Sequence, residues 1–287
     1  MLKLGCVPYM NALPLTYALN PQEVELIHRP PAELFKLLQN GQVEAALLPI
    51  VNYFENPDLY LVPNLAIACR GSVKSVSLYF ECHREEFEGR RGDLPGALGE
   101  LLRSARTIYL DPESRTSHAL LKVILHHKYG INLNTLHFTS NFSHSDIDAK
   151  LLIGDKTFHE KGVGFDLGAE WYSWQNKPFV FAAWMTLDPK SQVTNLLLES
   201  RNQGLQNIDK IIDQLTCSPS PHPGSTGSPR RLPPRERGIE RSLLKHYFTK
   251  NIHYTMEGPE LDGIRQFYKL LKPIQGYLHE LNFKFVS

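Results

Sequence analysis

Four consecutive polar residues, Ser114-Arg115-Thr116-Ser117, form a segment well suited to binding an anion. They follow a short apolar run and precede an amphipathic stretch that begins at His118, so we expect them between a strand and a helix. Backbone N–H groups, hydroxyls and a guanidinium would then converge at the positive end of the helix dipole. Ser and Thr also cap helices without binding a ligand. The position after a strand favours a carboxylate or phosphate site.

Polar or turn residues near the ends of other predicted strands, and at the first crossing between the predicted lobes, are further candidate ligand-binding residues: Tyr9, Asn11, Pro49, Asn52, Ser72, Gly154 and Asp155. Asn11 can donate to and accept from a hydroxyl or carboxylate, which makes it the candidate for a direct catalytic role. Asn and Asp at such positions also serve as turn residues and helix caps. For Asp155 we favour capping, although an aspartate there could orient a bound hydroxyl.

The first fifty residues alternate between strand and helix patterns. Pro31 and Gly41 bracket one amphipathic stretch, as expected of a helix that starts at a proline and ends before a glycine. The last apolar run is continuous, which is typical of a strand covered on both faces. We predict strands over 2–9, 24–28 and 43–50 and helices over 14–19 and 31–39. This βαβαβ order predicts a parallel sheet.

A second α/β unit follows. We predict strands over 73–81, 107–110, 136–139, 149–153 and 179–185, and helices over 117–129, 239–248 and 261–271. The chain therefore enters the second unit near residue 70 and leaves it near residue 183. We expect one lobe from 1–72 and 184–287 and another from 73–183, with a hinge and a central cleft in which a ligand binds.

Composition excludes several classes of protein. The 287 residues are 42% hydrophobic and carry a net charge of +1, so we expect folded cores and no nucleic-acid partner. No apolar run is long enough to span a membrane, and the first residues lack a signal peptide, so we expect a cytoplasmic protein. The segment over 218–238 is rich in Pro, Ser, Gly and Arg, and we interpret it as a mobile insertion rather than an anion site.

Common cofactor and metal motifs are missing from the sequence. It contains no G-x-G-x-x-G, Walker loop, G-x-S-x-G or H-E-x-x-H pattern. Its four cysteines form no C-x-x-C pair and match no zinc spacing, so we expect reduced thiols and no metal. His126 and His127 are adjacent and would point to different faces of a helix, which makes them a poor metal pair.

Five ordered motifs resemble the chorismate dehydratases of the futalosine route to menaquinone. They are V-P-Y-M-N-A-L-P-L (7–15), L-L-P-I-V-N-Y-F-E-N-P (47–57), S-R-T-S-H-A-L-L-K-V-I-L (114–125), L-L-I-G-D (151–155) and F-D-L-G-A-E-W-Y-S-W (165–174). Pro8 stands where that family usually has a serine, so the contact of that hydroxyl is left open. Residues beyond 200 match weakly.

The resemblance implies a type II periplasmic-binding-protein-like fold that is used for catalysis without a cofactor. It implies a lyase that removes water from chorismate to give 3-[(1-carboxyvinyl)oxy]benzoate (3-enolpyruvylbenzoate). Either a substrate carboxylate accepts the ring proton, or Asp155 or a histidine in the cleft does; we favour the carboxylate, oriented by Asn11. The alternatives are the 1,4-dihydroxy-6-naphthoate synthase of the same pathway and a non-catalytic cytoplasmic carboxylate-binding protein. The sequence leaves the oligomeric state open.

Overall fold

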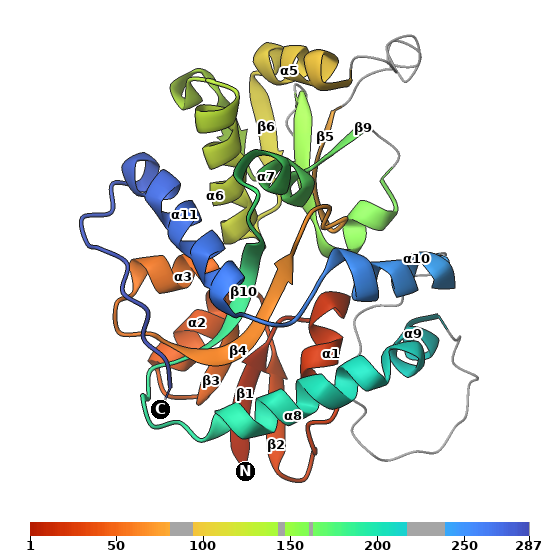
Figure 1. Cartoon of the computed structure of the whole chain (residues 1–287), viewed down its shortest axis with the longest axis vertical. Helices are drawn as coiled ribbons and strands as arrows, with labels where there is room; N and C mark the ends of the chain where they lie inside the picture. The colour runs from red at the N-terminus through yellow and green to blue at the C-terminus, as the bar shows by residue number, and fades with distance from the viewer. Residues whose placement is uncertain (81–93, 143–146, 161–162, 217–238, 287) are drawn as a thin grey trace.

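The computed structural model of the protein describes residues 1–80, 94–142, 147–160, 163–216 and 239–286. These residues form two five-stranded sheets, stacked one above the other in Figure 1 and flanked by helices. Each sheet and its helices form one lobe. The mixed α/β architecture predicted from the sequence is therefore confirmed.

The first sheet has the strand order β2-β1-β3-β10-β4. Its strands are β1 (Leu2–Cys6), β2 (Val24–His28), β3 (Ala45–Pro49), β4 (Tyr60–Cys69) and β10 (Phe179–Thr186). β1 pairs in parallel with β2 and β3, as the βαβαβ pattern predicts, whereas β10 is antiparallel to both β3 and β4. All five residues of β3 are buried, which explains its continuous apolar sequence.

Helices at both ends of the chain belong to the first lobe. They are η1 (Met10–Ala12), α1 (Leu13–Thr16), α2 (Pro31–Gln39), α3 (Ile50–Glu55), α8 (Val193–Gln206), α9 (Ile208–Thr216), α10 (Arg241–His246), η5 (Tyr247–Asn251) and α11 (Gly258–Gln275). α8 packs across α1. A Cβ on Gly204 would lie 2.0 Å from the carbonyl oxygen of Pro14, so the two helices approach closely only because this residue is glycine.

The second sheet has the order β7-β6-β8-β5-β9. Its strands are β5 (Val76–Phe80), β6 (Thr107–Leu110), β7 (His137–Thr139), β8 (Ala149–Ile153) and β9 (Val163–Asp166). Its helices are α5 (Leu94–Ser104), α6 (Arg115–Val123), η2 (Ile124–Lys128), η3 (Leu133–Thr135), η4 (Gly154–Phe158) and α7 (Leu167–Gln175). β6 pairs in parallel with β7 and β8, whereas β5 is antiparallel to β8 and β9.

The chain crosses between the sheets at residues 70–75 and again at 176–178. β10 lies whole in the first sheet, whereas the predicted division after residue 183 would cut it. Asp166 is the N-cap of α7 and also holds the first crossing in place. Its carboxylate accepts hydrogen bonds from Ser72 Oγ (2.7 Å) and from the backbone N–H groups of Val73 (3.1 Å) and Lys74 (2.8 Å). The start of α7 and the path between the sheets are therefore fixed together.

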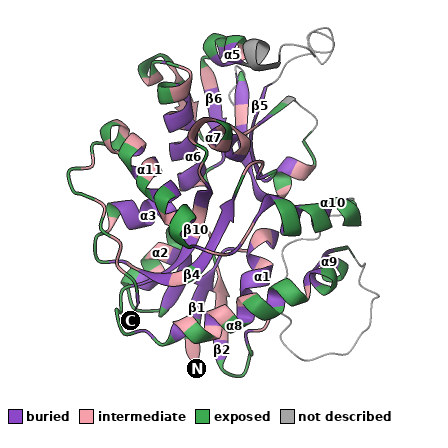
Figure 2. Ribbon diagram, viewed as in Figure 1, coloured by how far each residue is buried: buried purple, intermediate pink, exposed green. Residues whose placement is uncertain are grey.

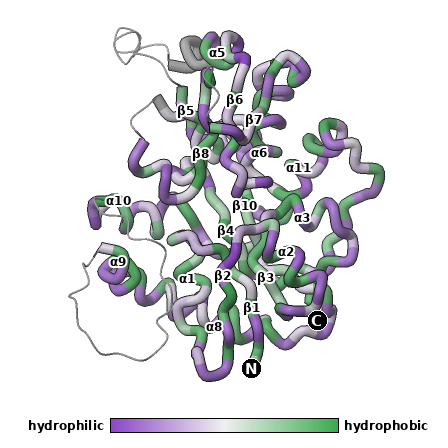
Figure 3. The backbone as a smooth tube through the Cα atoms, turned by 180° about the vertical axis from the view of Figure 1, so that it is seen from behind, coloured by the Kyte–Doolittle hydropathy of each residue, from purple (hydrophilic) through white to green (hydrophobic). Residues whose placement is uncertain are grey.

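Buried residues concentrate on the strands and on the inner faces of the helices (Figure 2). Seen from behind, the residues of β3 and β8 are mostly hydrophobic, whereas many residues of α9 and α10 are hydrophilic (Figure 3). Cys6 and Cys69 are buried free thiols, and Cys82 and Cys217 lie outside the described residues. Within the described ranges no helix has the length and apolar character needed to cross a membrane.

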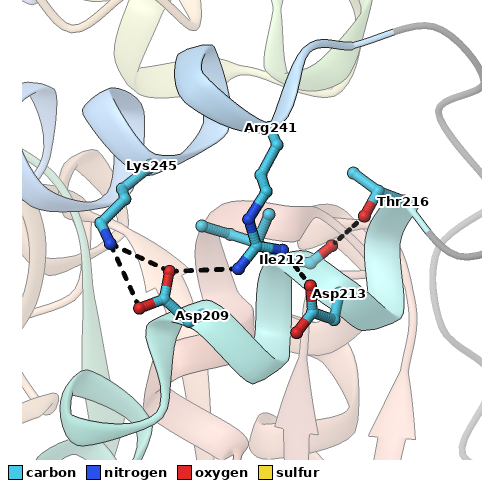
Figure 4. A network of polar contacts seen from close by, with 6 residues as sticks. All are labelled: Asp209, Ile212, Asp213, Thr216, Arg241 and Lys245. Atoms are coloured by element: carbon cyan, nitrogen blue, oxygen red, sulfur yellow. Dashed lines mark hydrogen bonds and ion pairs between the residues drawn. The ribbon is translucent and has the colours of Figure 1, made fainter.

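α9 and α10 stand on either side of residues 217–238, which include the predicted insertion and lie outside the described structure. Ion pairs link the two helices (Figure 4). The Arg241 guanidinium contacts the carboxylates of Asp209 and Asp213, and Lys245 Nζ lies 3.1 Å from Asp209 Oδ1. These contacts position α10, which continues directly into η5.

Candidate functional site

A cavity of about 80 Å³ lies between the two sheets, where β1, β3, β6 and β8 end. Its polar lining comes from both lobes and comprises Tyr9, Asn11, Ser75, Glu113, Ser114, Thr116 and Ser117. Its apolar lining includes Val7, Leu47, Ile67, Val76, Ile153 and Phe181. The carboxyl ends of strands in α/β sheets commonly meet at such a site. A few polar groups in an apolar cavity are typical of small-molecule sites.

The segment singled out first in the sequence begins α6 at this cavity. Ser114 is the N-cap: its hydroxyl accepts from the backbone N–H of Ser117 (3.4 Å) and donates to the Ser117 hydroxyl (2.6 Å). The Thr116 side chain lines the same cavity, and its buried Oγ1 has no hydrogen-bond partner in the described part of the chain. The segment therefore caps the helix and also leaves one buried hydroxyl available to a ligand.

Tyr9 and Gly154 meet across the cavity from opposite lobes. Gly154 adopts a left-handed backbone conformation with φ of 61°, which favours glycine. A Cβ placed on it would lie 3.8 Å from Cδ1 of Tyr9, so the tyrosine ring covers this turn. Burial, together with the nearby Glu113 carboxylate, raises the pKa of Tyr9, and its phenol keeps its proton at neutral pH.

Asn11 lies in η1, directly after β1. Its amide oxygen is buried and has no hydrogen-bond partner among the described residues, although the side chain lines the cavity. A buried carbonyl oxygen without a partner is costly, because it has lost its hydrogen bonds to water. A ligand that donates a hydrogen bond would remove this cost.

The charged groups beside the cavity pair with one another. Lys156 Nζ lies 2.7 Å from the fully buried carboxylate of Asp111 and 3.8 Å from Glu113. The described lining itself contains no Lys, Arg or His. An anion in the cavity would therefore depend on the hydroxyls and on the positive end of the α6 dipole.

Four residues predicted from the sequence lie outside the cavity lining: Asn52, Ser72, Arg115 and Asp155. Asn52 is buried in α3, and Ser72 donates to Asp166 at the crossing between the sheets. The Arg115 guanidinium points to Glu55 of α3, and Asp155 follows Gly154 in η4. The other predicted residues, Tyr9, Asn11, Pro49, Ser114, Thr116, Ser117 and Gly154, line one cavity.

The sequence interpretation missed Ser75, Glu113 and Phe181, which also line the cavity. Glu113 directly precedes the Ser114 motif, and Ser75 lies three residues after the predicted Ser72. Their proximity in the sequence was the available signal. Phe181 lies inside an apolar strand sequence and carries no local signal that separates it from a core residue.

Comparisons with known proteins agree with the fold. The chain is 29% identical to the chorismate dehydratase of Thermus thermophilus over 93% of this chain and 94% of the relative. Protein AF1704 of Archaeoglobus fulgidus superposes with a TM-score of 0.66 at 13% identity, over 96% of this chain and 98% of that one. The periplasmic aliphatic sulphonate binding protein SsuA of Escherichia coli superposes with a TM-score of 0.60 at 12% identity, over 100% of this chain and 95% of that one.

The two-lobed periplasmic-binding-protein-like fold expected from the sequence is therefore confirmed. A family model described as menaquinone biosynthesis matches residues 2–273, which covers both sheets and the whole cavity lining. The chain belongs to this menaquinone biosynthesis family.

Proposed function

We propose that this protein is a chorismate dehydratase, a lyase that converts chorismate to 3-enolpyruvylbenzoate and water without a cofactor. The observation that carries the proposal is the match to the Thermus thermophilus enzyme along nearly the full length of both chains. The cavity supports it, because its hydroxyls and the α6 terminus suit a carboxylate and its apolar walls suit a ring.

Three parts of the substrate have a counterpart in the cavity: one carboxylate, the ring and the ring hydroxyl. One carboxylate would lie at the start of α6, where the Thr116 hydroxyl is buried and without a partner. The ring would pack between Phe181 and Ile153, which come from opposite lobes. The ring hydroxyl would donate to the free amide oxygen of Asn11. Contacts from both lobes would favour a closed form with ligand bound.

Ligand entry would require the lobes to separate. The cavity of about 80 Å³ is smaller than the roughly 300–1,000 Å³ that is usual for small-molecule sites. The chain crosses between the sheets at residues 70–75 and 176–178, and two such connections allow a hinge motion. We therefore propose that lobe opening admits the substrate and releases the product.

The reaction breaks one ring C–H bond and the C–O bond to the ring hydroxyl, and the ring becomes aromatic as water leaves. Aromatisation supplies the driving force, so the protein mainly orients the substrate and assists the proton transfers. The described lining contains neither Asp nor His, and its Glu113 lies beside Lys156. We therefore propose that a carboxylate of the substrate accepts the ring proton, with Asn11 orienting the reacting ring.

An ultraviolet assay tests this function directly. Purified protein in a chelator-treated buffer should convert chorismate to a product that co-elutes with 3-enolpyruvylbenzoate, and N11A should be strongly impaired. E113Q should retain most of the activity if the substrate supplies the base. Chorismate that binds but stays unchanged, with the protein folded, would instead identify a carboxylate-binding protein. Turnover of the naphthoate synthase substrate without chorismate turnover would identify the other enzyme of the pathway.

A further inference from the structure

Ser75 has a side-chain partner from a distant part of the sequence. It ends the first crossing between the sheets, directly before β5, and its buried side chain lines the cavity. The phenol of Tyr247, the first residue of η5, donates a hydrogen bond of 2.9 Å to Ser75 Oγ. Tyr247 is fully buried, and its ring packs edge-on against Phe158 with centroids 5.1 Å apart. Tyr247 therefore contacts a cavity residue although it is not itself one of the described lining residues.

The backbone around Ser75 is fixed by other contacts. Its N–H donates to the carbonyl oxygen of Val73 (2.8 Å), and its carbonyl oxygen accepts from the N–H of Gly154 (2.8 Å). Asn251, the last residue of η5, donates from its side-chain nitrogen to the carbonyl oxygen of Ser72 at 2.9 Å. η5 therefore holds the first crossing at residues 72 and 75, and the Ser75 side chain is the part that can still rotate.

The direction of the hydrogen bond decides what Ser75 offers to a ligand. Burial raises the pKa of Tyr247, so the phenol keeps its hydrogen near neutral pH and donates it to Ser75 Oγ. Ser75 then has its own hydrogen left to donate. Within the described residues the carbonyl oxygen of Val73 lies 3.5 Å from Ser75 Oγ, which is longer than the roughly 2.5–3.0 Å usual for an O–H···O bond. A ligand oxygen in the cavity would therefore be the better acceptor.

We infer that Tyr247 is a positioning residue that holds the Ser75 side chain in one rotamer, so that the Ser75 hydroxyl donates a hydrogen bond to an acceptor oxygen of the ligand. The inference rests on the proposed function for the identity of that ligand. It adds to the proposed site a donor and the residue that orients it. Because Tyr247 comes from η5 and Ser75 from the crossing between the sheets, the orientation of this donor depends on how the first lobe packs on the crossing.

Tyr247→Phe removes the phenol oxygen and keeps the ring, so the packing on Phe158 is retained. Ser75→Ala removes the hydroxyl that Tyr247 holds. Tyr254→Phe is the matched control, because Tyr254 is also buried and its hydroxyl has no hydrogen-bond partner among the described residues. We expect S75A to lower kcat/KM about tenfold or more and Y247F to lower it about three- to tenfold, because each removes an oriented donor from the site. Y254F should match the wild type.

A double-mutant cycle separates positioning from a general structural effect. In the S75A background, Y247F should cause no further loss of kcat/KM, because Tyr247 acts through Ser75. Losses that multiply in the double variant, or wild-type kcat/KM in either single variant, would overturn the inference while leaving the proposed function intact.

A second measurement does not depend on turnover. In protein labelled with ¹³C,¹⁵N-serine, the Ser75 Cβ signal is assigned by its disappearance in S75A, and three-bond couplings to the Cβ hydrogens report the χ1 angle. We expect the couplings of a single staggered rotamer in wild type and Y254F, and averaged couplings in Y247F. A single, unchanged Ser75 rotamer in Y247F would refute the inference even if chorismate proves not to be the substrate.

Discussion

Arg115 Nη2 lies 2.7 Å from Oε1 and 2.6 Å from Oε2 of Glu55, which joins the start of α6 in the second lobe to α3 in the first. The sequence motif suggested a substrate contact for Arg115, but its charge is directed to a carboxylate outside the cavity. Both side chains are partly exposed, so the pair is worth little to overall stability. Because the pair lies between the lobes, we expect it to affect ligand binding instead.

Removing this pair should weaken ligand binding without affecting chemistry. Because the proposed separation of the lobes would break this contact, E55Q and R115Q should each raise KM about two- to fivefold, equivalent to roughly 0.4–1 kcal/mol, with kcat unchanged. The double variant should resemble either single one. R265Q, which breaks the Arg265–Asp262 pair within α11, is the control. A loss of kcat in R115Q but not in E55Q would instead indicate that Arg115 contacts the substrate.

Thr116 and Ser114 should respond in opposite ways to loss of their hydroxyls. T116V replaces a buried hydroxyl without a partner by a methyl group, so the free energy of unfolding should be unchanged or higher, while KM rises about fivefold or more. S114A removes the N-cap and should lower the free energy of unfolding by roughly 1 kcal/mol. Thermal unfolding and steady-state kinetics measure both. Wild-type KM in T116V would show that no ligand uses this hydroxyl.

Replacing Gly154 by alanine should cause no steric clash but should strain the backbone. The added Cβ would lie at ordinary contact distance from Tyr9, whereas φ of 61° costs a non-glycine residue roughly 1–2 kcal/mol. G154A should lose about this much stability in urea unfolding and should bind substrate more weakly if the turn shifts toward Tyr9. G130A, at a helix end with φ of 66° and open space, should lose similar stability with normal kinetics.

His118 should make the protein less stable in mild acid. Its Nε2 lies 2.6 Å from the carbonyl oxygen of Asp111; burial lowers its pKa below 6.5, with Lys122 and Arg115 acting in the same direction and the Asp111 contacts opposing them. Below pH 6.5 the unfolded chain therefore binds more protons than the native one, and stability falls as the pH decreases. Above that pH the residue contributes no slope.

The measurement compares the urea midpoint at pH 7.5 and pH 5.0 in wild type and H118Q. The variant should lose less stability between the two values. The stability of H118Q should still fall somewhat with decreasing pH, because burial also lowers the pKa of His28 and His253. Equal slopes in the two proteins would mean that His118 titrates as in an unfolded chain.

Local patterns were sufficient to predict several elements with their bounds. The range 24–28 matches β2, 31–39 matches α2, and 107–110 and 149–153 match β6 and β8. Each is a short apolar or amphipathic run bounded by turn residues or caps. The predicted strand over 43–50 ends instead at Pro49, where α3 begins with apolar residues. A continuous apolar run does not by itself distinguish a buried strand from a buried helix.

Other features depend on contacts that no local pattern contains. β4 was not predicted, and its sequence includes Pro63 and Asn64, with Asn64 at φ of 58°. The cavity was anticipated because parallel strands bring their carboxyl ends together, which placed Tyr9, Thr116 and Gly154 near one another. Tyr247 lies 172 residues after Ser75 in the sequence, and its phenol donates a hydrogen bond to the Ser75 hydroxyl. The sequence around Tyr247 does not distinguish it from an ordinary core aromatic residue.

The place of β10 has a consequence for synthesis on the ribosome. The strands of the second sheet come from one continuous stretch, residues 76–166, and can pair as soon as that stretch has emerged. The first sheet cannot form as early, because β10 lies between β3 and β4. The last residue of β10 is synthesised more than a hundred residues after the end of β4. Until then both strands keep an unpaired edge, which is open to wrong pairing or aggregation. The nascent chain is therefore most exposed to chaperones while its second lobe is being made.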